Sequence, residues 1–600
     1  MRFLSRLSGG YRVFAVTGTN TVSFGIDFSG ADTAGLLGFA VERADPAENE
    51  RYYLRGMKVF EAVIPHPDET TIVTTYDHPV QSFVWDDFTA KPGRKYTYWF
   101  HPLKGTPKNL DRSAPPIEVS VETEAHGAGP THDIYFNRGV ASSQAYAQKF
   151  ENKSPDDQPT PDKVKQAYEW LSRGLEEALL QFIRDVPAGD TLLGCFYEFT
   201  YPAVAAELRA ALDRGVTVKL VIDGKVNEHT DKKGFHPSSP RTENKATVKA
   251  AKLGKAVVRW REANPTNIQH NKFMVRLAGA AAKPVEVWTG STNLTRSGIF
   301  GQTNVGHRVS DAKLARQFAA YWDALAKDHG SKAGDSSTKA KAAKKAWRQE
   351  VMDLGEVPAK WSDIPQGVTA VFSPRSGGDV LDMYVAALDE AEHLACITLA
   401  FGIGKDFKTS LVDNAGSNAV TFLLLEKRDR PNANSTTPFV PLKASNNVYQ
   451  AWGAYLRDPV SQWTRETDSK ALGITHFVKY IHSKFLLHDP LGADPIVIAG
   501  SANFSDASTN DNDENMLLIR GDQRVADIYF TEFNRLFFHY YFRSVFEQIH
   551  ERKKPVGDHA DPSSSLFLDI TGEWLTKYAP NTLKTKRVGI FTGMANAVQG

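Results

Sequence analysis

The sequence predicts an α/β protein with two pseudo-symmetric halves, preceded by an all-β sandwich domain. Three observations lead to this prediction. Residues 1–125 hold short strand-like runs punctuated by Gly and Pro. From about residue 130 onward, helical stretches alternate with continuous apolar strands. The same order of stretches then occurs a second time, which indicates an internal repeat.

Composition and charge are those of a globular protein. An apolar fraction of 41% and a charged fraction of 24% exclude a disordered or fibrous chain. The formal net charge is +1, from 71 basic and 70 acidic residues, which argues against a protein built around non-specific nucleic-acid binding. A local basic groove and phosphate substrates stay compatible with this balance, because a phosphate group needs only a few well-placed cations.

Residues 1–125 are expected to form the β-sandwich, because runs such as TVSFGIDF and ETTIVTTY follow one another at short intervals. In RKYTYWF, the alternation puts Tyr96, Tyr98 and Phe100 on one face of a strand. This strand resembles the penultimate strand of fibronectin type III domains. No chemistry is predicted for this domain.

The two halves are predicted at 130–328 and 366–553. The first contains helical stretches at 174–186 and 203–215 and apolar strands at 191–199 and 216–223, and the second contains the corresponding stretches 379–391, 393–401 and 419–427. Continuous apolar strands between helices indicate a largely buried sheet. The lysine-bearing segment 329–365 is predicted to be a solvated linker or exposed helix. Residues 554–600 are predicted to be a C-terminal extension packed on the body.

Neither a cofactor nor a metal site is predicted. The two cysteines, Cys195 and Cys396, lie in apolar strands and are expected to be buried thiols rather than a disulfide or zinc ligands. No apolar stretch is long enough to span a membrane. The N-terminus lacks the apolar core of a signal peptide, so a cytoplasmic location is expected.

The chemistry is carried by two short motifs that occur once in each half. An HxK segment is followed by an apolar strand and then by GSxN. One HxK would arise by chance among 17 histidines, but two in equivalent places of a repeat are a strong signal. The residues are His270, Lys272, Ser291 and Asn293 in the first half, and His482, Lys484, Ser501 and Asn503 in the second.

These residue types suit phosphodiester chemistry. Residues i and i+2 of a strand share a face, so each histidine projects beside its lysine, and packing of the halves about a two-fold axis would bring both pairs into one cleft. Two lysines and two asparagine amides can stabilise the charge of a phosphoryl transition state. One imidazole can attack phosphorus while the other protonates the leaving oxygen.

The paired HxKx4D and GSxN motifs are similar to those of the phospholipase D superfamily, over about residues 130–550. The resemblance implies two phospholipase D-like repeats that form one metal-independent site and work through a phosphohistidine. It implies that His270 and His482 are the nucleophile and the general acid, with His270 as the nucleophile. It also implies that Lys272, Lys484, Asn293 and Asn503 bind phosphate, with support from Ser291 and Ser501.

The two halves differ at the carboxylates that the family pattern contains. The aspartate of HxKx4D is Asp489 in the second half, but Leu277 stands there in the first. The glutamate after GSxN is Glu514 in the second half, and the matching position of the first is Asn304. A carboxylate that orients an imidazole also stabilises its cation, so the two histidines are expected to be inequivalent. The sequence leaves open which histidine Glu514 contacts.

Three further residues are weighed as substrate contacts. Arg138 and Arg375 occupy equivalent positions near the start of each half and either flank the phosphate or lie at the surface. Glu198 follows a strand of the first half and either faces the cleft or caps the strand.

A phosphodiester is the expected substrate, and a phospholipid head group is the leading hypothesis, with peripheral membrane contact as a possible accompaniment. A nuclease of the same fold is the first alternative, although it would need a basic channel. A catalytically silent binding protein is the second alternative.

Overall fold

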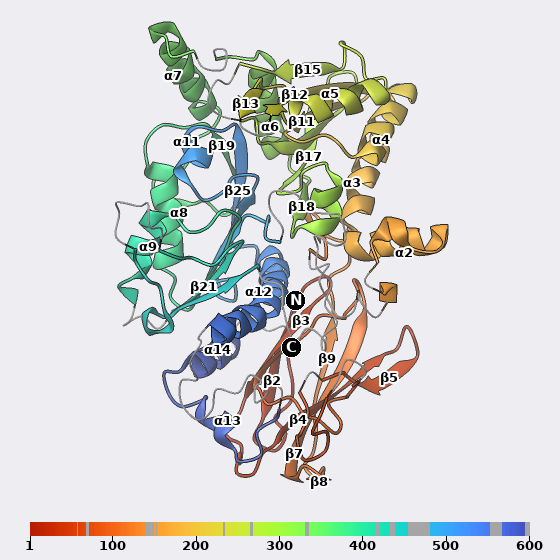
Figure 1. The fold of residues 1–600 in the computed structure, drawn as a ribbon, viewed down its shortest axis with the longest axis vertical. Helices are drawn as coiled ribbons and strands as arrows, with labels where there is room; N and C mark the ends of the chain where they lie inside the picture. The colour runs from red at the N-terminus through yellow and green to blue at the C-terminus, as the bar shows by residue number, and fades with distance from the viewer. Residues whose placement is uncertain are drawn as a thin grey trace.

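The computed structural model describes residues 1–56, 58–67, 71–139, 146, 149–151, 153–231, 234–263, 268–330, 335–414, 419–431, 439–453, 480–551 and 567–593. Figure 1 shows a β-rich domain at one end and two α/β bodies beside each other at the other end. Among the described helices, none combines the length and the apolar composition needed to cross a bilayer.

The N-terminal domain consists of two antiparallel sheets packed face to face. The interface between them is aromatic: the Phe24 ring lies 4.8 Å from that of Tyr98 and 5.1 Å from that of Phe100. Tyr96, Tyr98 and Phe100 are all buried, which confirms their common face. The fibronectin type III resemblance stays a prediction. One sheet has the order β1 (Arg2–Leu4), β2 (Arg12–Thr17), β3 (Val22–Asp27), β6 (Val84–Asp87); the other has the order β5 (Glu50–Tyr53), β4 (Gly38–Asp45), β7 (Lys95–Thr106), β8 (Asn109–Asp111), with β9 (Ile117–Glu122) also on β7.

The two α/β repeats contain seven-stranded sheets with the same strand order, and the predicted α/β fold class is confirmed. Within each sheet three strands are parallel and the others antiparallel. The first sheet runs β10 (His132–Phe136), β18 (Val305–Val309), β17 (Lys283–Gly290), β16 (Lys272–Ala278), β11 (Thr191–Phe196), β12 (Thr217–Asp223), β15 (Val258–Arg261). The second runs β19 (Gly367–Ser373), β25 (Glu514–Arg520), β24 (Ile496–Gly500), β23 (Phe485–His488), β20 (Leu394–Leu399), β21 (Val420–Leu425), β22 (Val448–Trp452).

Helices cover both sheets because each has an apolar stripe. In the helix Leu175–Arg184, the buried residues recur at the spacing of one helical face. The thiols of Cys195 in β11 and Cys396 in β20 are free and buried, as predicted. The helices are α2 (Pro161–Ser172), α3 (Leu175–Arg184), α4 (Pro202–Asp213), α5 (Arg241–Ala250) and α6 (Ala312–Ala326) in the first repeat, and α8 (Asp379–Asp389), α9 (Lys405–Leu411), α11 (Asp506–Asn510) and α12 (Gln523–Glu551) in the second.

The closing helix of each repeat crosses to the first strand of the other repeat. From α6, Tyr321 stacks on Phe372 of β19 at 4.5 Å, and from α12, Tyr529 meets Phe136 of β10 at 5.1 Å. This reciprocal exchange holds the two sheets in a pseudo-two-fold arrangement. It therefore sets how the two HxK segments meet.

Two segments outside the repeats also pack on the body. The region 329–365, predicted to be a linker, includes α7 (Thr338–Met352), whose Trp347 is buried. At the C-terminus, α13 (Glu573–Thr576) and α14 (Leu583–Thr592) contact the sandwich: Trp574 lies 5.4 Å from Phe83, and Phe591 lies against Gly25. The domain boundaries themselves stay a prediction.

Candidate active site

The two HxK segments start at the same edge of the two sheets, where β16 and β23 begin. An acidic residue at or just past the end of the middle parallel strand, β12 or β21, accepts a hydrogen bond from the backbone at each start. Asp223 accepts from the Gln269 backbone N–H at 3.1 Å, and Glu426 accepts from that of Ile481 at 2.7 Å. Sequence reasoning missed this pair, although an acid directly follows each apolar run, in LVID and LLLE.

The histidine of each repeat is oriented by a side chain from the other repeat. His270 Nδ1 lies 2.9 Å from both carboxylate oxygens of Glu514. His482 Nδ1 lies 2.9 Å from Asn304 Oδ1. The GSxN serines complete the pattern, since Ser501 donates to Glu514 at 2.7 Å and Ser291 donates to Asn304 at 2.8 Å. The sequence left open which histidine Glu514 contacts, and in the structure Glu514 contacts His270.

These bonds define the tautomer of both imidazoles. Asn304 donates through Nδ2 to the Gly298 oxygen at 2.8 Å, so its Oδ1 is an acceptor and His482 Nδ1 carries the proton. An ionised Glu514 accepts from His270 Nδ1–H in the same way. In both rings the Nε2 lone pair is then available for chemistry.

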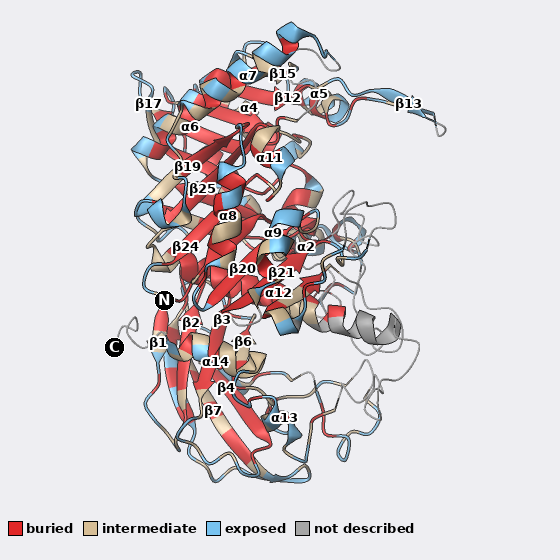
Figure 2. Ribbon diagram, turned by 90° about the vertical axis from the view of Figure 1, so that its left-hand side faces the viewer, coloured by how far each residue is buried: buried red, intermediate tan, exposed pale blue. Residues whose placement is uncertain are grey.

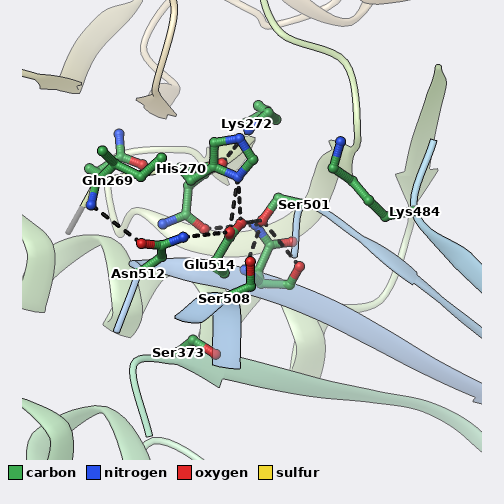
Figure 3. Close-up of polar contacts among 12 residues, drawn as sticks. Gln269, His270, Lys272, Ser373, Lys484, Ser501, Ser508, Asn512 and Glu514 are labelled. Carbon is green, nitrogen blue, oxygen red and sulfur yellow. Dashed lines mark hydrogen bonds and ion pairs between the residues drawn. The ribbon is translucent and has the colours of Figure 1, made fainter. Parts of the chain in front are cut away.

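The lysines lie in the same site as both histidines. Figure 3 shows Lys272 beside the His270 ring and Lys484 farther along, on the same side of the pair formed by His270 and Glu514. Each ammonium group donates to the backbone oxygen of the histidine two residues before it. The Lys272 ammonium also lies 5.5 Å from the centre of the Tyr197 ring, which packs edge-on against His270 at 5.0 Å. Tyr197 was not anticipated from the sequence.

Burial and mutual repulsion set the electrostatics of the site. Burial lowers the pKa of His270 and of His482 well below the usual imidazole value, and both lysine ammonium groups lower it further. Burial also lowers the pKa of Lys272 to about 8 and that of Lys484 well below its usual value. Because each lysine acts on both histidines, the four groups form one cluster. A bound phosphate anion would oppose these shifts, because its negative charge favours the protonated form of each of the four groups.

Glu514 is buried at the centre of this cluster. Burial raises the pKa of its carboxyl group to about 7, against the opposing effect of Lys272 and Lys484. Its ionisation is therefore poised near neutral pH. The symmetry-related Asn304 carries no charge, so the two histidines differ in environment, as expected.

The asparagines of both GSxN motifs each have a buried side-chain oxygen. Among the described residues, Asn293 Oδ1 and Asn503 Oδ1 are buried without a hydrogen-bond partner, which is uncommon. Asn293 donates through Nδ2 to Glu198, whose charge acts to raise the pKa of both Lys272 and Lys484, so Glu198 lies near the cluster. The matching position in the second repeat is Phe401, which is 72% exposed.

Asp489 lies at the far end of β23 from His482. Its carboxylate accepts from three successive backbone N–H groups, those of residues 392–394, at 2.8–2.9 Å. In the first repeat, where Leu277 replaces the aspartate, Asp190, directly before the neighbouring strand β11, supplies a carboxylate and accepts from Gly279 N–H at 2.7 Å. The missing aspartate of the first motif is thus compensated structurally, at a distance from the histidines.

The two arginines proposed as phosphate contacts lie elsewhere. Arg138 donates to the Trp170 oxygen at 3.0 Å and stacks over that ring, and its charged neighbours are Arg173, Arg535 and Glu532. Arg375 donates to the Phe372 oxygen at 3.3 Å and lines a small cavity with α8 and α11 residues. In the described part of the chain neither contacts an HxK residue, and their role in phosphate binding stays a prediction.

The helix α7 is fastened to the segment that carries Glu514. Trp347 Nε1 donates to Asp513 Oδ1 at 3.0 Å, and Arg261 Nε donates to the other oxygen at 3.0 Å. The backbone oxygen of Asp513 in turn accepts from His270 N–H at 2.9 Å. The α7 helix therefore supports the contact between the repeats from behind.

Replacing Trp347 with phenylalanine removes one donor from the buried Asp513 carboxylate. We expect the free energy of unfolding to fall by about 1–3 kcal/mol, with a lower kcat and an unchanged KM. Denaturant unfolding and steady-state kinetics measure this. The matched control is Trp361→Phe, which removes a donor from the exposed Glu390 at 2.8 Å and should change stability by less than about 0.5 kcal/mol. Equal losses in the two variants would contradict the support role.

Comparisons with known proteins agree with this geometry. The family model described as "Cardiolipin synthase, PLD-like domain" matches residues 183–326 and 385–537, one span in each repeat. The chain belongs to the phospholipase D superfamily, whose members transfer phosphodiester groups. No curated protein matches the chain.

Several solved structures are similar to it at low identity. Phosphatidylserine synthase from Haemophilus influenzae Rd KW20 is 12% identical, with 70% of this chain and 93% of that one covered and a TM-score of 0.41. Polyphosphate kinase from Porphyromonas gingivalis is 11% identical, and the chain spans 43% of its length, over 59% of its own, with a TM-score of 0.34. Nuc, a phospholipase D family member from Salmonella typhimurium, is 18% identical over 28% of this chain and 92% of that one, with a TM-score of 0.19.

Proposed function

We propose that this protein cleaves or transfers phosphodiesters, with phospholipid head groups as the substrate class, through a phosphohistidine on His270. The observation that carries the proposal is the reciprocal orientation of the two histidines, His270 by Glu514 and His482 by Asn304. It gives one buried site two imidazoles with available Nε2 atoms and two ammonium groups. The description of the matching family model, cardiolipin synthase, supports a phospholipid substrate.

In the first step, His270 Nε2 attacks phosphorus as the bond from phosphorus to the leaving oxygen breaks. His482, protonated once the phosphate anion is bound, gives its Nε2 proton to that oxygen. The phosphorylated His270 ring keeps Nδ1–H and carries positive charge, which the Glu514 carboxylate stabilises. A neutral amide at Asn304 suits His482, which must release its proton.

In the second step, His482 is neutral and takes a proton from water or from an alcohol. The oxygen so activated attacks phosphorus and breaks its bond to His270, which restores the enzyme. Attack by water gives hydrolysis, and attack by an alcohol gives transfer. Lys272, Lys484 and the two asparagine amides supply fixed charge and hydrogen-bond donors to the phosphoryl oxygens in both steps.

A substrate panel tests the proposal. Vesicles of phosphatidylcholine, phosphatidylethanolamine and phosphatidylglycerol are compared with plasmid and single-stranded oligonucleotides, all with a chelator present and with His270→Asn as the blank. We expect head-group release from vesicles by the wild type only. Turnover of nucleic acid without turnover of lipid would contradict a phospholipid substrate and would indicate a nuclease. Absence of turnover on every phosphodiester would favour a silent binding protein.

A further inference from the structure

A two-stranded hairpin stands apart from the seven-stranded sheet of the first repeat. It consists of β13 (His229–Asp231) and β14 (Gly234–His236), and it follows β12 in the chain. Figure 2 shows it projecting well beyond the body, with exposed residues along its length. An isolated two-stranded hairpin is marginally stable in water, so this one needs a further source of stability.

Three potential metal ligands lie on one face of this hairpin. His229 is directly opposite His236 in the strand register, and Asp231 is two residues after His229 on the same strand. Cross-strand partners and residues i and i+2 share a face of a sheet. One ligand atom from each of the three side chains lies within 4.8 Å of the others. Gly234 is opposite Asp231 and leaves open space beside it.

The three side chains lie at the surface of the hairpin. His229 and Asp231 are exposed and His236 is half-buried, so none of them belongs to a core. On the other face, Phe235 is 65% exposed. The base of the hairpin is anchored separately, because Asn227 bonds both ways with the Ser239 backbone at 2.8 and 3.0 Å. The part beyond the base is joined by the His229 and His236 rings, which stack at 4.8 Å, and by His236 Nε2, 3.0 Å from Asp231 Oδ1.

We propose that His229, Asp231 and His236 bind one divalent transition-metal ion, with Zn²⁺ as the ion that the donor set fits best. Two imidazole nitrogens and one carboxylate oxygen are a donor set that Zn²⁺ accepts, whereas Mg²⁺ and Ca²⁺ prefer oxygen donors alone. Three protein ligands leave a fourth tetrahedral position for water. His229 Nδ1 lies 3.3 Å from the Asn227 oxygen, a contact of the kind that orients a ligand imidazole and directs Nε2 to the metal.

The ion would close the hairpin across its two strands. Its ligands are not among the residues assigned to catalysis, and the proposal does not depend on the phosphodiesterase activity. The sequence did not indicate this site, because the ligands form no recognised metal motif and only the strand register brings His236 opposite His229.

Calorimetric titration of the chelator-stripped, full-length protein with ZnCl₂ tests the proposal. We expect one ion per chain, with affinity at least about tenfold weaker in His229→Ala and in His236→Ala. The matched control is His393→Ala, which removes an exposed imidazole from the second repeat and should bind as the wild type does. With Cu²⁺ as the probe, electron paramagnetic resonance should report two coordinated nitrogens in the wild type and one in each hairpin variant.

The His270→Asn variant separates this site from the catalytic one and should keep full Zn²⁺ affinity. Zn²⁺ binding that is unchanged in the double variant H229A/H236A would mean that the ion binds elsewhere, and would overturn the proposal. Absence of binding to the wild type would overturn it as well. Unchanged thermal unfolding of the ion-free variants would show that any loss of affinity is local.

Discussion

Replacing His482 with asparagine is expected to give an enzyme that releases one equivalent of p-nitrophenol from bis(p-nitrophenyl) phosphate and then stalls. The p-nitrophenolate leaving group needs no proton, so attack by His270 can proceed. The second step needs a base to activate water, and asparagine cannot take that proton. Turnover should therefore fall by about 10³-fold or more. Rapid-quench kinetics detect the burst, and mass spectrometry of the acid-labile adduct locates it on His270.

The counterpart His270→Asn should show neither burst nor turnover, with a loss of at least about 10⁴-fold, because the nucleophile itself is missing. Both asparagine variants should unfold at temperatures close to that of the wild type, which separates chemistry from folding. A burst in His270→Asn and none in His482→Asn would reverse the two assignments.

Replacing Glu514 with glutamine is expected to reduce kcat/KM by about 10²-fold at pH 8 while increasing stability there. The glutamine amide would keep a hydrogen bond to His270 but could not stabilise the cationic phosphohistidine. Burial raises the pKa of the Glu514 carboxyl to about 7, so in the wild type kcat/KM should rise with pH through about 7 as the carboxylate forms. That acid-side limb should be absent in the variant. The pH dependence of kcat/KM measures both effects.

The stability effect follows from the same shift. A carboxyl whose pKa is higher in the folded than in the unfolded state stabilises the protein below its unfolded pKa, and this stabilisation is lost as pH rises through the folded value. The wild type should thus lose stability relative to Glu514→Gln between about pH 4.3 and 7. The matched control, Asn304→Asp, puts a carboxylate beside His482 instead and should preserve the limb contributed by Glu514. If the rise of kcat/KM near pH 7 persists in Glu514→Gln, the rise comes from the ionisation of another group.

Much of the fold and of the site could be predicted from the sequence because both depend on local patterns. Apolar strands alternating with helices indicated the α/β class, and their recurrence indicated two repeats. The alternation of Tyr96, Tyr98 and Phe100 defined a buried face. His270 with Lys272, and His482 with Lys484, were recognisable because i and i+2 spacing on a strand is a property of the backbone itself.

What the sequence did not determine depends on contacts between distant segments. It showed that Glu514 and Asn304 occupy matching positions, but the assignment of Glu514 to His270 arises from the pairing of Gln269 with Asp513 across the two repeats. It showed that Leu277 replaces an aspartate, but the compensation by Asp190 comes from the residue directly before the neighbouring strand β11.

The sequence by itself therefore indicated the superfamily and predicted the residues of the candidate site, because residue type and short-range spacing encode both. Only the tertiary structure decided which histidine has a charged partner, that α7 supports the site, and that His229 lies opposite His236. Those outcomes depend on strand register and on the packing of one repeat against the other, and side chains brought together in this way leave no periodic trace along the chain.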